Sequence, residues 1–278
     1  MLKTVLLAIS ILVVLSIANA WSVDVNEDND FIKIQTAGYE AWWRKPSIRS
    51  GYIQIFVAGS QESITGMADR TFFHSSQYAG GWKHWGPLLD WEIIEEVPGK
   101  TVIRYESADA GTKEYICIAS YYDSVPYIKH EVTITNTGAD PVTSFQNGHE
   151  PMFEPNRDFE GMQSFDQPFP HVAYWVEEGY FAALYGPDAQ QARTTNWQDR
   201  NPGRMDLMHD NLGEELKKGE SATVTYYVAF GEGDEKEATE LAEDVTKEPP
   251  LGGAISSVDT VATTWGWVRN TKQVGQHQ

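Results

Sequence analysis

The sequence predicts an all-β protein, a large antiparallel β-sandwich with one short surface helix near its C-terminus. Three observations lead to this prediction: segments rich in β-branched and aromatic residues with partial alternation, turn residues between them, and a single helical pattern. The expected strands are residues 31–36, 52–57, 101–105, 114–122, 127–135 and 222–230. Long strands with short connections favour two large sheets that pack face to face.

The connections carry the residues that tight reversals require. Pro98-Gly99-Lys100 and Lys218-Gly219-Glu220 are two such turns, and the segment from Asn136 to Pro141 is a third. Helical periodicity is convincing over Glu235 to Lys247, which we expect to form a surface helix packed on a sheet. The apolar face of this helix consists of Ala238, Leu241, Ala242 and Val245.

The first 20 residues have the features of a secretory signal peptide. Lys3 precedes an apolar run that ends in Ala18-Asn19-Ala20, an A-x-A cleavage site, and the run is shorter than the roughly 20 residues that cross a bilayer. We therefore expect a secreted or periplasmic protein without a transmembrane anchor. The expected organisation is a signal peptide at 1–20, a sandwich domain at 21–248 and a tail at 249–278, partly docked because it holds Trp265 and Trp267.

Composition excludes several classes of partner and cofactor. The chain has 21 basic and 40 acidic residues, a formal charge of −19, which argues against nucleic acid as a partner. The single cysteine, Cys117, lies in an apolar run and is expected to be buried and inert. We expect no cofactor and no metal, because nucleotide-binding and zinc motifs are missing; the alternative is calcium bound by Asp199, Asp206 and Asp210. The sequence predicts no particular oligomeric state.

Two stretches, Met67 to Trp91 and Asn147 to Arg204, lack a regular pattern and are dense in aromatic and ionisable residues, so we expect functional loops there. A sugar suits this mixture, since its apolar C–H face stacks on Trp or Tyr while its hydroxyls need polar partners. A carbohydrate is therefore the expected ligand. The expected binding residues are Arg70, His74, Trp82, Trp85, Asn147, His171, Tyr174, Arg193 and Trp197.

Several segments resemble the galactose mutarotase (aldose epimerase) superfamily. Val125 to Pro141 looks like a pair of central strands joined by a "tNtgd-P" turn, and Phe145 to Phe153 resembles the "G-x-H-P-Y-F" segment. His171 to Pro187 is similar to the strand pair that brings in the family's catalytic glutamate, and Leu216 to Ser221 to its closing "L-x-P-G-E-S" element. The resemblance covers roughly residues 100 to 232 and implies a mutarotase-like supersandwich.

The resemblance also implies that His149 is a catalytic histidine. Ala183 to Pro187 stands where the family carries an acidic "v-E-P", so a carboxylate must come from another position. The candidates are Glu150, Glu154, Glu177 and Glu178, of which Glu154 is the best placed. Ring opening of an aldose uses such a pair, one group that takes the anomeric proton and one that protonates the ring oxygen. The expected catalytic residues are His149, Glu154 and His84.

The activity itself stays open between several alternatives. An epimerase-like isomerase would use the pair just described. A polysaccharide lyase would remove the proton α to a uronate carboxyl with Tyr or His and neutralise the carboxylate with Arg, Asn or a metal. A carbohydrate-binding module would need no acid–base pair, and the reading outside the carbohydrate class is an envelope-associated structural or interaction protein.

Overall fold

The computed structural model describes residues 23–46, 53–57, 72–78, 81–108, 112–149, 159–177, 179–197, 200–210, 212 and 215–251. For residues 57, 72–78, 81–84, 147–149, 159, 197, 200 and 201 it describes the backbone alone. The predicted signal peptide lies outside these ranges. Within them, none of the helices has the length and apolar character needed to cross a membrane.

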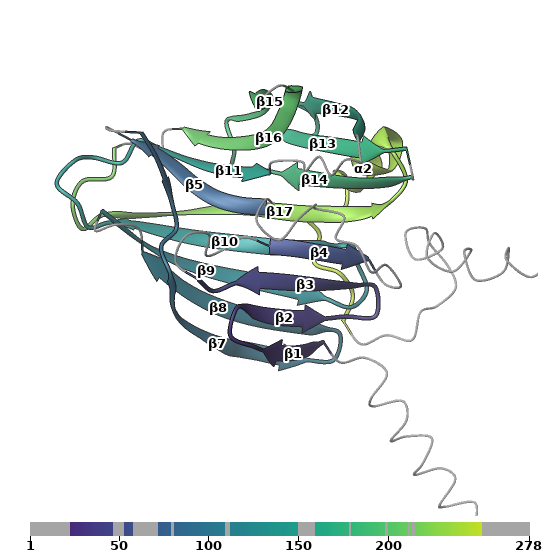
Figure 1. Ribbon diagram of the computed structural model, residues 1–278, viewed down its shortest axis with the longest axis horizontal. Coiled ribbons are helices and arrows are strands. Elements are labelled where there is room, and N and C mark those ends of the chain that lie inside the picture. Colours follow the sequence, from purple (N-terminus) through teal and green to yellow (C-terminus); the bar gives the residue numbers. More distant parts are fainter. Residues whose placement is uncertain are drawn as a thin grey trace, which may run out of the picture.

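One sheet contains nine strands, eight of them in the order β1-β2-β3-β4-β5-β11-β16-β15 (Figure 1). The ninth strand, β6, pairs with β5. Neighbouring strands of this sheet pair antiparallel. The strands are β1 (Asp24–Glu27), β2 (Phe31–Gln35), β3 (Tyr39–Arg44), β4 (Ile53–Val57), β5 (Phe72–Tyr78), β6 (Gly81–His84), β11 (Ser144–His149), β15 (Gln191–Trp197) and β16 (Arg200–Asp210).

The second sheet contains eight strands, in the order β12-β13-β14-β17-β10-β9-β8-β7, again with antiparallel pairing. The strands are β7 (Leu88–Val97), β8 (Lys100–Ala108), β9 (Lys113–Tyr122), β10 (Tyr127–Asn136), β12 (Phe159–Phe165), β13 (His171–Val176), β14 (Tyr180–Tyr185) and β17 (Ser221–Glu232). The all-β sandwich is therefore confirmed, and each of the six expected strands is present with its ends within three residues of the expected positions.

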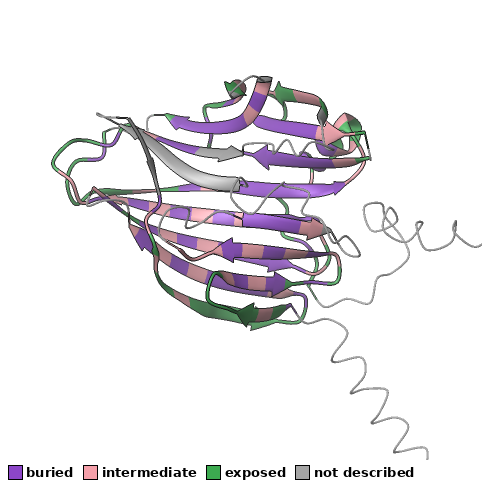
Figure 2. Cartoon of the chain, in the orientation of Figure 1, coloured by how far each residue is buried: buried purple, intermediate pink, exposed green. Residues whose placement is uncertain are grey.

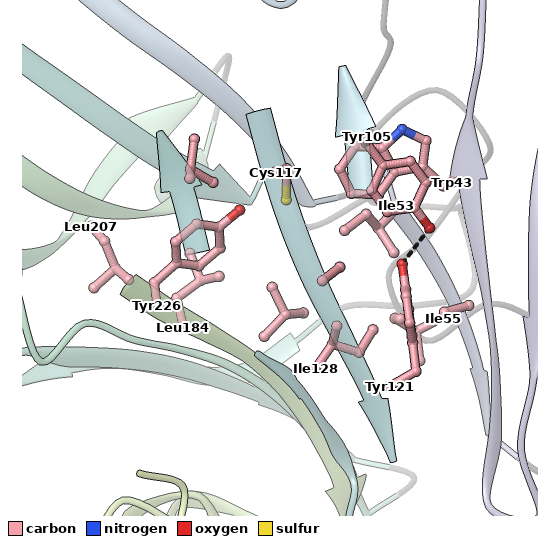
Figure 3. Packing of buried hydrophobic residues seen from close by; sticks show 14 of the residues in the cluster. Trp43, Ile53, Ile55, Tyr105, Cys117, Tyr121, Ile128, Leu184, Leu207 and Tyr226 are labelled. Carbon is pink, nitrogen blue, oxygen red and sulfur yellow. Dashed lines mark hydrogen bonds between the residues drawn. The ribbon is translucent and has the colours of Figure 1, made fainter. Parts of the chain in front are cut away.

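The main core fills the space between the two sheets. Buried and partly exposed residues alternate along the strands, which gives the striped pattern of Figure 2 and follows from the two-residue period of a strand. Trp43 stacks on Tyr105 with ring centroids 3.8 Å apart, and the hydroxyls of Tyr105 and Tyr121 lie 2.8 Å apart (Figure 3). Cys117 is fully buried here, as expected, and burial raises the pKa of its thiol.

A smaller core lies on the outward face of the eight-stranded sheet, under helix α2 (Glu235–Leu241). Asp234 caps the helix in a capping box with Glu237. The four apolar residues predicted for the helix face all pack in this cluster. The predicted end at Lys247 is wrong, because the helix ends at Leu241 and turns follow it.

The turn at Asn136 is held by its own side chain. The fully buried Asn136 amide donates to the carbonyls of Asp140 and Leu216, each at 2.8 Å, and its oxygen accepts from the Gly138 N–H at 2.9 Å. Val142 and Leu216 exchange backbone hydrogen bonds beside it. Two segments that carry the family resemblance, the "tNtgd-P" turn and the closing element, therefore meet in space.

The two stretches expected to be loops are largely strands, which corrects that expectation. Met67 to Trp91 contains β5, β6 and the start of β7, and Asn147 to Arg204 contains β12 to β15 with parts of β11 and β16. The physical reason is visible in β13 and β14, which are buried on both faces because the cluster under α2 covers their outward side. A strand buried on both faces shows no alternation in sequence.

Candidate ligand-binding face

The predicted catalytic residues lie at the limit of what the structure describes. His149 is the last residue of β11, where its backbone pairs with Phe72 of β5 and Met205 of β16, and His84 is the last residue of β6. The side chains of these two histidines, and the whole of Glu154, lie outside the described residues. The expected acid–base arrangement therefore stays a prediction.

The predicted binding residues do not converge on one place. Trp85 and Tyr174 belong to the core between the sheets, with 1% and 5% of their surface exposed, and Trp85 stacks on Tyr115 at 4.6 Å. These positions favour packing over ligand contact. Arg70 lies outside the described residues, and for His74, Trp82, Asn147 and Trp197 the structure describes the backbone alone.

His171 lies on the outward face of the other, eight-stranded sheet. Its ring stacks between Phe165 and Tyr185, with centroids 4.8 Å and 5.4 Å away. Nδ1 lies 2.8 Å from the Phe169 carbonyl oxygen, which accepts hydrogen bonds and therefore fixes the proton on Nδ1. Burial lowers the pKa of His171, so the ring is neutral at physiological pH. β13, which carries His171, and β11, which carries His149, belong to different sheets.

Arg193 is the predicted binding residue that lies in a charged cluster. The carboxylate of Asp206 is fully buried and pairs with Arg204, whose Nε lies 2.9 Å from Oδ1, and with Arg193, whose Nε lies 3.5 Å from Oδ2. Thr195 donates to the same carboxylate at 3.1 Å. Two guanidiniums on one carboxylate leave a local charge of +1 in an otherwise acidic chain. We call the two arginines, Arg193 and Arg204, together with the Asp206 carboxylate that they share, the arginine pair.

The register of β15 and β16 brings the arginine pair together. Arg193 is opposite Asp206, and Thr195 is opposite Arg204, so the four side chains share one face of the sheet. The neighbouring Met205 belongs to the core. Because successive side chains of a strand alternate, the arginine pair lies on the face that points away from the core.

Trp42 is a candidate that sequence reasoning missed. Its ring centroid lies 4.5 Å from that of Phe56 and 5.5 Å from that of Phe31, while the Lys33 ammonium lies 4.3 Å from its centre. Its Nε1 donates to a Glu40 carboxylate oxygen at 3.1 Å. These five residues, which we call the Trp42 platform, are all partly exposed.

Alternation along β3 is the signal that could have identified the platform. Residues 39, 41 and 43 are buried, and residues 40, 42 and 44 are partly exposed. Trp42 therefore lies on the outward face between Glu40 and Arg44, whereas its neighbour Trp43 is a core residue. Two adjacent tryptophans have opposite environments, and the charged residues on either side distinguish them.

The Trp42 platform and the arginine pair lie on the same outward face of the nine-stranded sheet. Four strand-to-strand steps separate β3 from β16, which at about 4.8 Å each places the two groups about 19 Å apart. Gln54, opposite Trp42, and Gln146, opposite Met208, lie on this face between them, with 5% and 0% of their surface exposed. The exposed parts of the Trp42 platform and the arginine pair are therefore separated by buried amides.

The calcium alternative receives no support from the described residues. Asp206 is a strand residue engaged by two arginines, and Asp199 lies outside the described ranges. No group of three or more His, Cys, Asp or Glu side chains in the described ranges could hold a metal ion. The residues of the Trp42 platform and the arginine pair are suited to an organic or anionic ligand.

No model of a protein family and no curated protein matches this chain. Solved structures do match its fold, among them the following three with TM-scores of 0.50. The heparan sulfate lyase HepC from Pedobacter heparinus is 9% identical, and the match covers 77% of this chain and 37% of the lyase chain. The α-galactosidase AgaB from Geobacillus stearothermophilus is 8% identical, and the match covers 78% of this chain and 42% of the galactosidase chain. A TPR-domain containing protein from Parabacteroides distasonis is 11% identical, and the match covers 79% of this chain and 50% of that protein's chain.

Identities this low show the fold alone. This chain spans between 37% and 50% of the length of those three proteins, so the activity of none of them transfers to it as a whole. The resemblance to the galactose mutarotase superfamily is supported at the level of the large sandwich. Membership of that superfamily stays a prediction.

Proposed function

We propose that this chain is an exported carbohydrate-binding protein whose ligand lies on the outward face of the nine-stranded sheet. The observation that carries the proposal is the Trp42 platform, a partly exposed indole held between two aromatic rings and flanked by Lys33 and Glu40. An indole of this kind stacks on the apolar face of a pyranose, and the adjacent charges bond its hydroxyls. The export signal at residues 1–20 is part of the same proposal.

The similar solved structures support the proposal without deciding it. A heparan sulfate lyase and an α-galactosidase share the fold, and these proteins act on carbohydrate by name. A TPR-domain containing protein shares it at the same TM-score, so the fold by itself does not select a ligand. The choice of a carbohydrate rests on the residues of the Trp42 platform.

The arginine pair favours an acidic sugar over a neutral one. Arg193 is about one-third exposed and, with Arg204, carries one positive charge beyond what Asp206 neutralises. Guanidinium groups bind carboxylates and sulfates through paired hydrogen bonds. The arginine pair lies about 19 Å from the Trp42 platform across the buried Gln54 and Gln146, so it is proposed as a separate contact for an acidic group of a long glycan.

The more specific form of the proposal is that the protein also catalyses a reaction of the bound carbohydrate. His149, Glu154 and His84 are the proposed acid–base residues, in an epimerase-like isomerase or a polysaccharide lyase. His149 lies on β11, next to β16 and therefore one strand from the arginine pair. The register sets His149 opposite Met205, a core residue, so its position on β11 and the arginine pair belong to opposite faces of the sheet. A lyase that used His149 as its base would therefore need another group to neutralise the uronate carboxylate.

The test is a glycan screen on the chain from residue 21 onward, with thermal shift and calorimetry for binding and ultraviolet absorbance for unsaturated products. We expect binding to an acidic glycan, and we expect Trp42→Ala to weaken it at least about tenfold, equivalent to about 1.4 kcal/mol. Trp175→Ala is the matched control, since Trp175 is also partly buried but packs on the other sheet over Gly161.

The outcomes separate binding from catalysis. Binding that Trp42→Ala removes and Trp175→Ala preserves supports the proposed face. Product formation that His149→Ala abolishes while binding persists supports a lyase, and anomer exchange followed by polarimetry tests the epimerase in the same way. Binding that is unchanged in Trp42→Ala, or no binding to any glycan, would refute the proposed function.

A further inference from the structure

The edge strand β7 exposes more large apolar surface than any other element in the described part of the chain. Leu89, Ile93, Ile94 and Val97 are 62%, 42%, 46% and 37% exposed. The one other exposed large hydrophobic residue among those described is Leu251, at 42%. Scattered apolar residues need no explanation, but four on one strand indicate a surface that something covers.

β7 also has a backbone edge available for pairing. It is the last strand of the eight-stranded sheet, and within the described ranges it pairs with β8 alone. An edge strand of ten residues presents a row of N–H and C=O groups that can pair with a further strand. Proteins usually protect such an edge by covering it, by making it short, or with charges and bulges. β7 has two bulges and four acidic residues, but it is ten residues long and no strand of the described ranges pairs with its outer edge.

The last residues that the structure describes lie beside one end of β7. Lys100, directly after the β7–β8 turn, pairs with Glu248 at 3.1 Å and with Glu95 of β7 at 3.5 Å. Val97 is opposite Lys100 in the hairpin. The chain therefore passes the end of β7 at Glu248, three residues before Leu251, and residues 252–278 follow from there.

The composition of residues 252–278 is complementary to β7. The stretch from Thr260 to Arg269 consists mainly of Thr, Val and Trp, residues that favour strands, and follows Gly252-Gly253. No acidic residue occurs after Asp259, whereas Arg269 and Lys272 are basic. The acidic residues of β7 are Asp90, Glu92, Glu95 and Glu96, and β7 contains no Lys or Arg.

We propose that residues 260–269 of the same chain add to the free edge of β7 as a further antiparallel strand. The direction follows from the position of Glu248: a chain that leaves from the Val97 end of β7 and runs along the strand travels opposite to it. A second copy of β7 is a poor occupant, because self-pairing would set its acidic residues against each other. This inference is independent of the proposed function.

The test compares hydrogen exchange of the β7 amides in the full chain and in two proline variants, Thr263→Pro and Thr264→Pro. Proline removes one N–H from the ladder, and since successive N–H groups of a strand point in opposite directions, one of the two variants must break a bond to β7. In that variant we expect the outward β7 amides to exchange at least about tenfold faster than in the full chain. Gln276→Pro, beyond the proposed strand, is the control and should change nothing.

A chain that ends at Leu251 provides the second measurement. Its β7 amides should also exchange faster, and a synthetic peptide of residues 254–272 should restore their protection. Sedimentation velocity should show that the full chain is monomeric under the conditions in which its β7 amides are protected from hydrogen exchange. Equal exchange of β7 in the full chain and in both proline variants would overturn the proposal, as would protection that appears only when the chain dimerises.

Discussion

The buried His209 predicts a loss of stability on mild acidification. His209 lies on β16 with 1% of its surface exposed, opposite Phe145, whose ring centroid is 6.2 Å away. Burial lowers the pKa of His209 from its ordinary value of 6.5 to about 4, and the negative charge of Asp188 opposes this in part. The folded chain therefore keeps this imidazole neutral at a pH where the unfolded chain protonates it.

The size of the effect follows from that pKa difference. Between pH 6.5 and pH 4 the unfolded chain binds a proton that the folded chain does not, so the free energy of unfolding decreases as the pH falls through this window. The full difference between 6.5 and about 4 corresponds to about 3 kcal/mol. Integration from pH 7 to pH 5 gives a loss of about 2 kcal/mol from His209 alone.

Urea unfolding at pH 7, 6 and 5, with the parent chain and His209→Gln, measures this loss. Glutamine keeps a neutral polar side chain and does not titrate, so the variant should lose about 2 kcal/mol less than the parent over this range. His171, whose pKa is also lowered by burial, acts in the same direction in both chains and cancels in the comparison. Identical pH dependence in the two chains would refute the reasoning.

Three further predictions concern buried polar groups. Tyr121→Phe leaves the buried Tyr105 hydroxyl without its partner and should cost about 1–3 kcal/mol of unfolding free energy, whereas changing both to Phe should cost less than the sum of the single changes; strict additivity in urea unfolding would contradict this. Asn136→Ala removes three buried hydrogen bonds and should cost about 2–4 kcal/mol by the same measurement, so a cost below about 1 kcal/mol would show that the turn does not depend on them. Asp206→Asn leaves two guanidiniums without their carboxylate and should lower the free energy of unfolding by about 1–2 kcal/mol. This is less than the cost of breaking a fully buried ion pair, because Arg193 is about one-third exposed. A variant that is more stable than the parent at low salt would contradict the prediction.

The sequence predicts the central strands well because their two faces differ. β10 and β17 pair over nine positions, and along β10 the even-numbered residues are buried while most odd-numbered ones are partly exposed. The turns at Gly99 and Gly219 can also be predicted from the sequence. Both glycines have a positive φ, 83° and 85°, which other residues rarely adopt. The helix is recognisable from the spacing of its apolar residues, although its last turn unwinds before Lys247.

The candidate site was harder to predict because it depends on register between distant strands. Trp42, Trp43 and Trp85 look alike in sequence, yet the first lies outward and the other two are in the core. The arginine pair forms because Arg193 is opposite Asp206, a pairing that local pattern does not specify. Expecting loops at residues 147–204 failed for the reason already seen in β13 and β14, where burial on both faces removes the alternation.

The two outward faces of the sandwich differ in what occupies them, and this difference bears on where a ligand binds. On the eight-stranded sheet, α2 and the residues after it cover one end: Tyr185 donates to the carbonyl of Ala238, and Tyr127 donates to that of Lys247. Paired hydroxyls such as Thr133 and Thr223 line β10 and β17 beside it, with no aromatic ring among them. Elsewhere on this face the rings of Phe165, His171 and Tyr185 pack against one another, and charges such as Lys129 and Glu131 pair with opposite sign. The nine-stranded sheet differs in that two arginines share one carboxylate and so leave a surplus positive charge, which is the reason for proposing that an acidic ligand binds there.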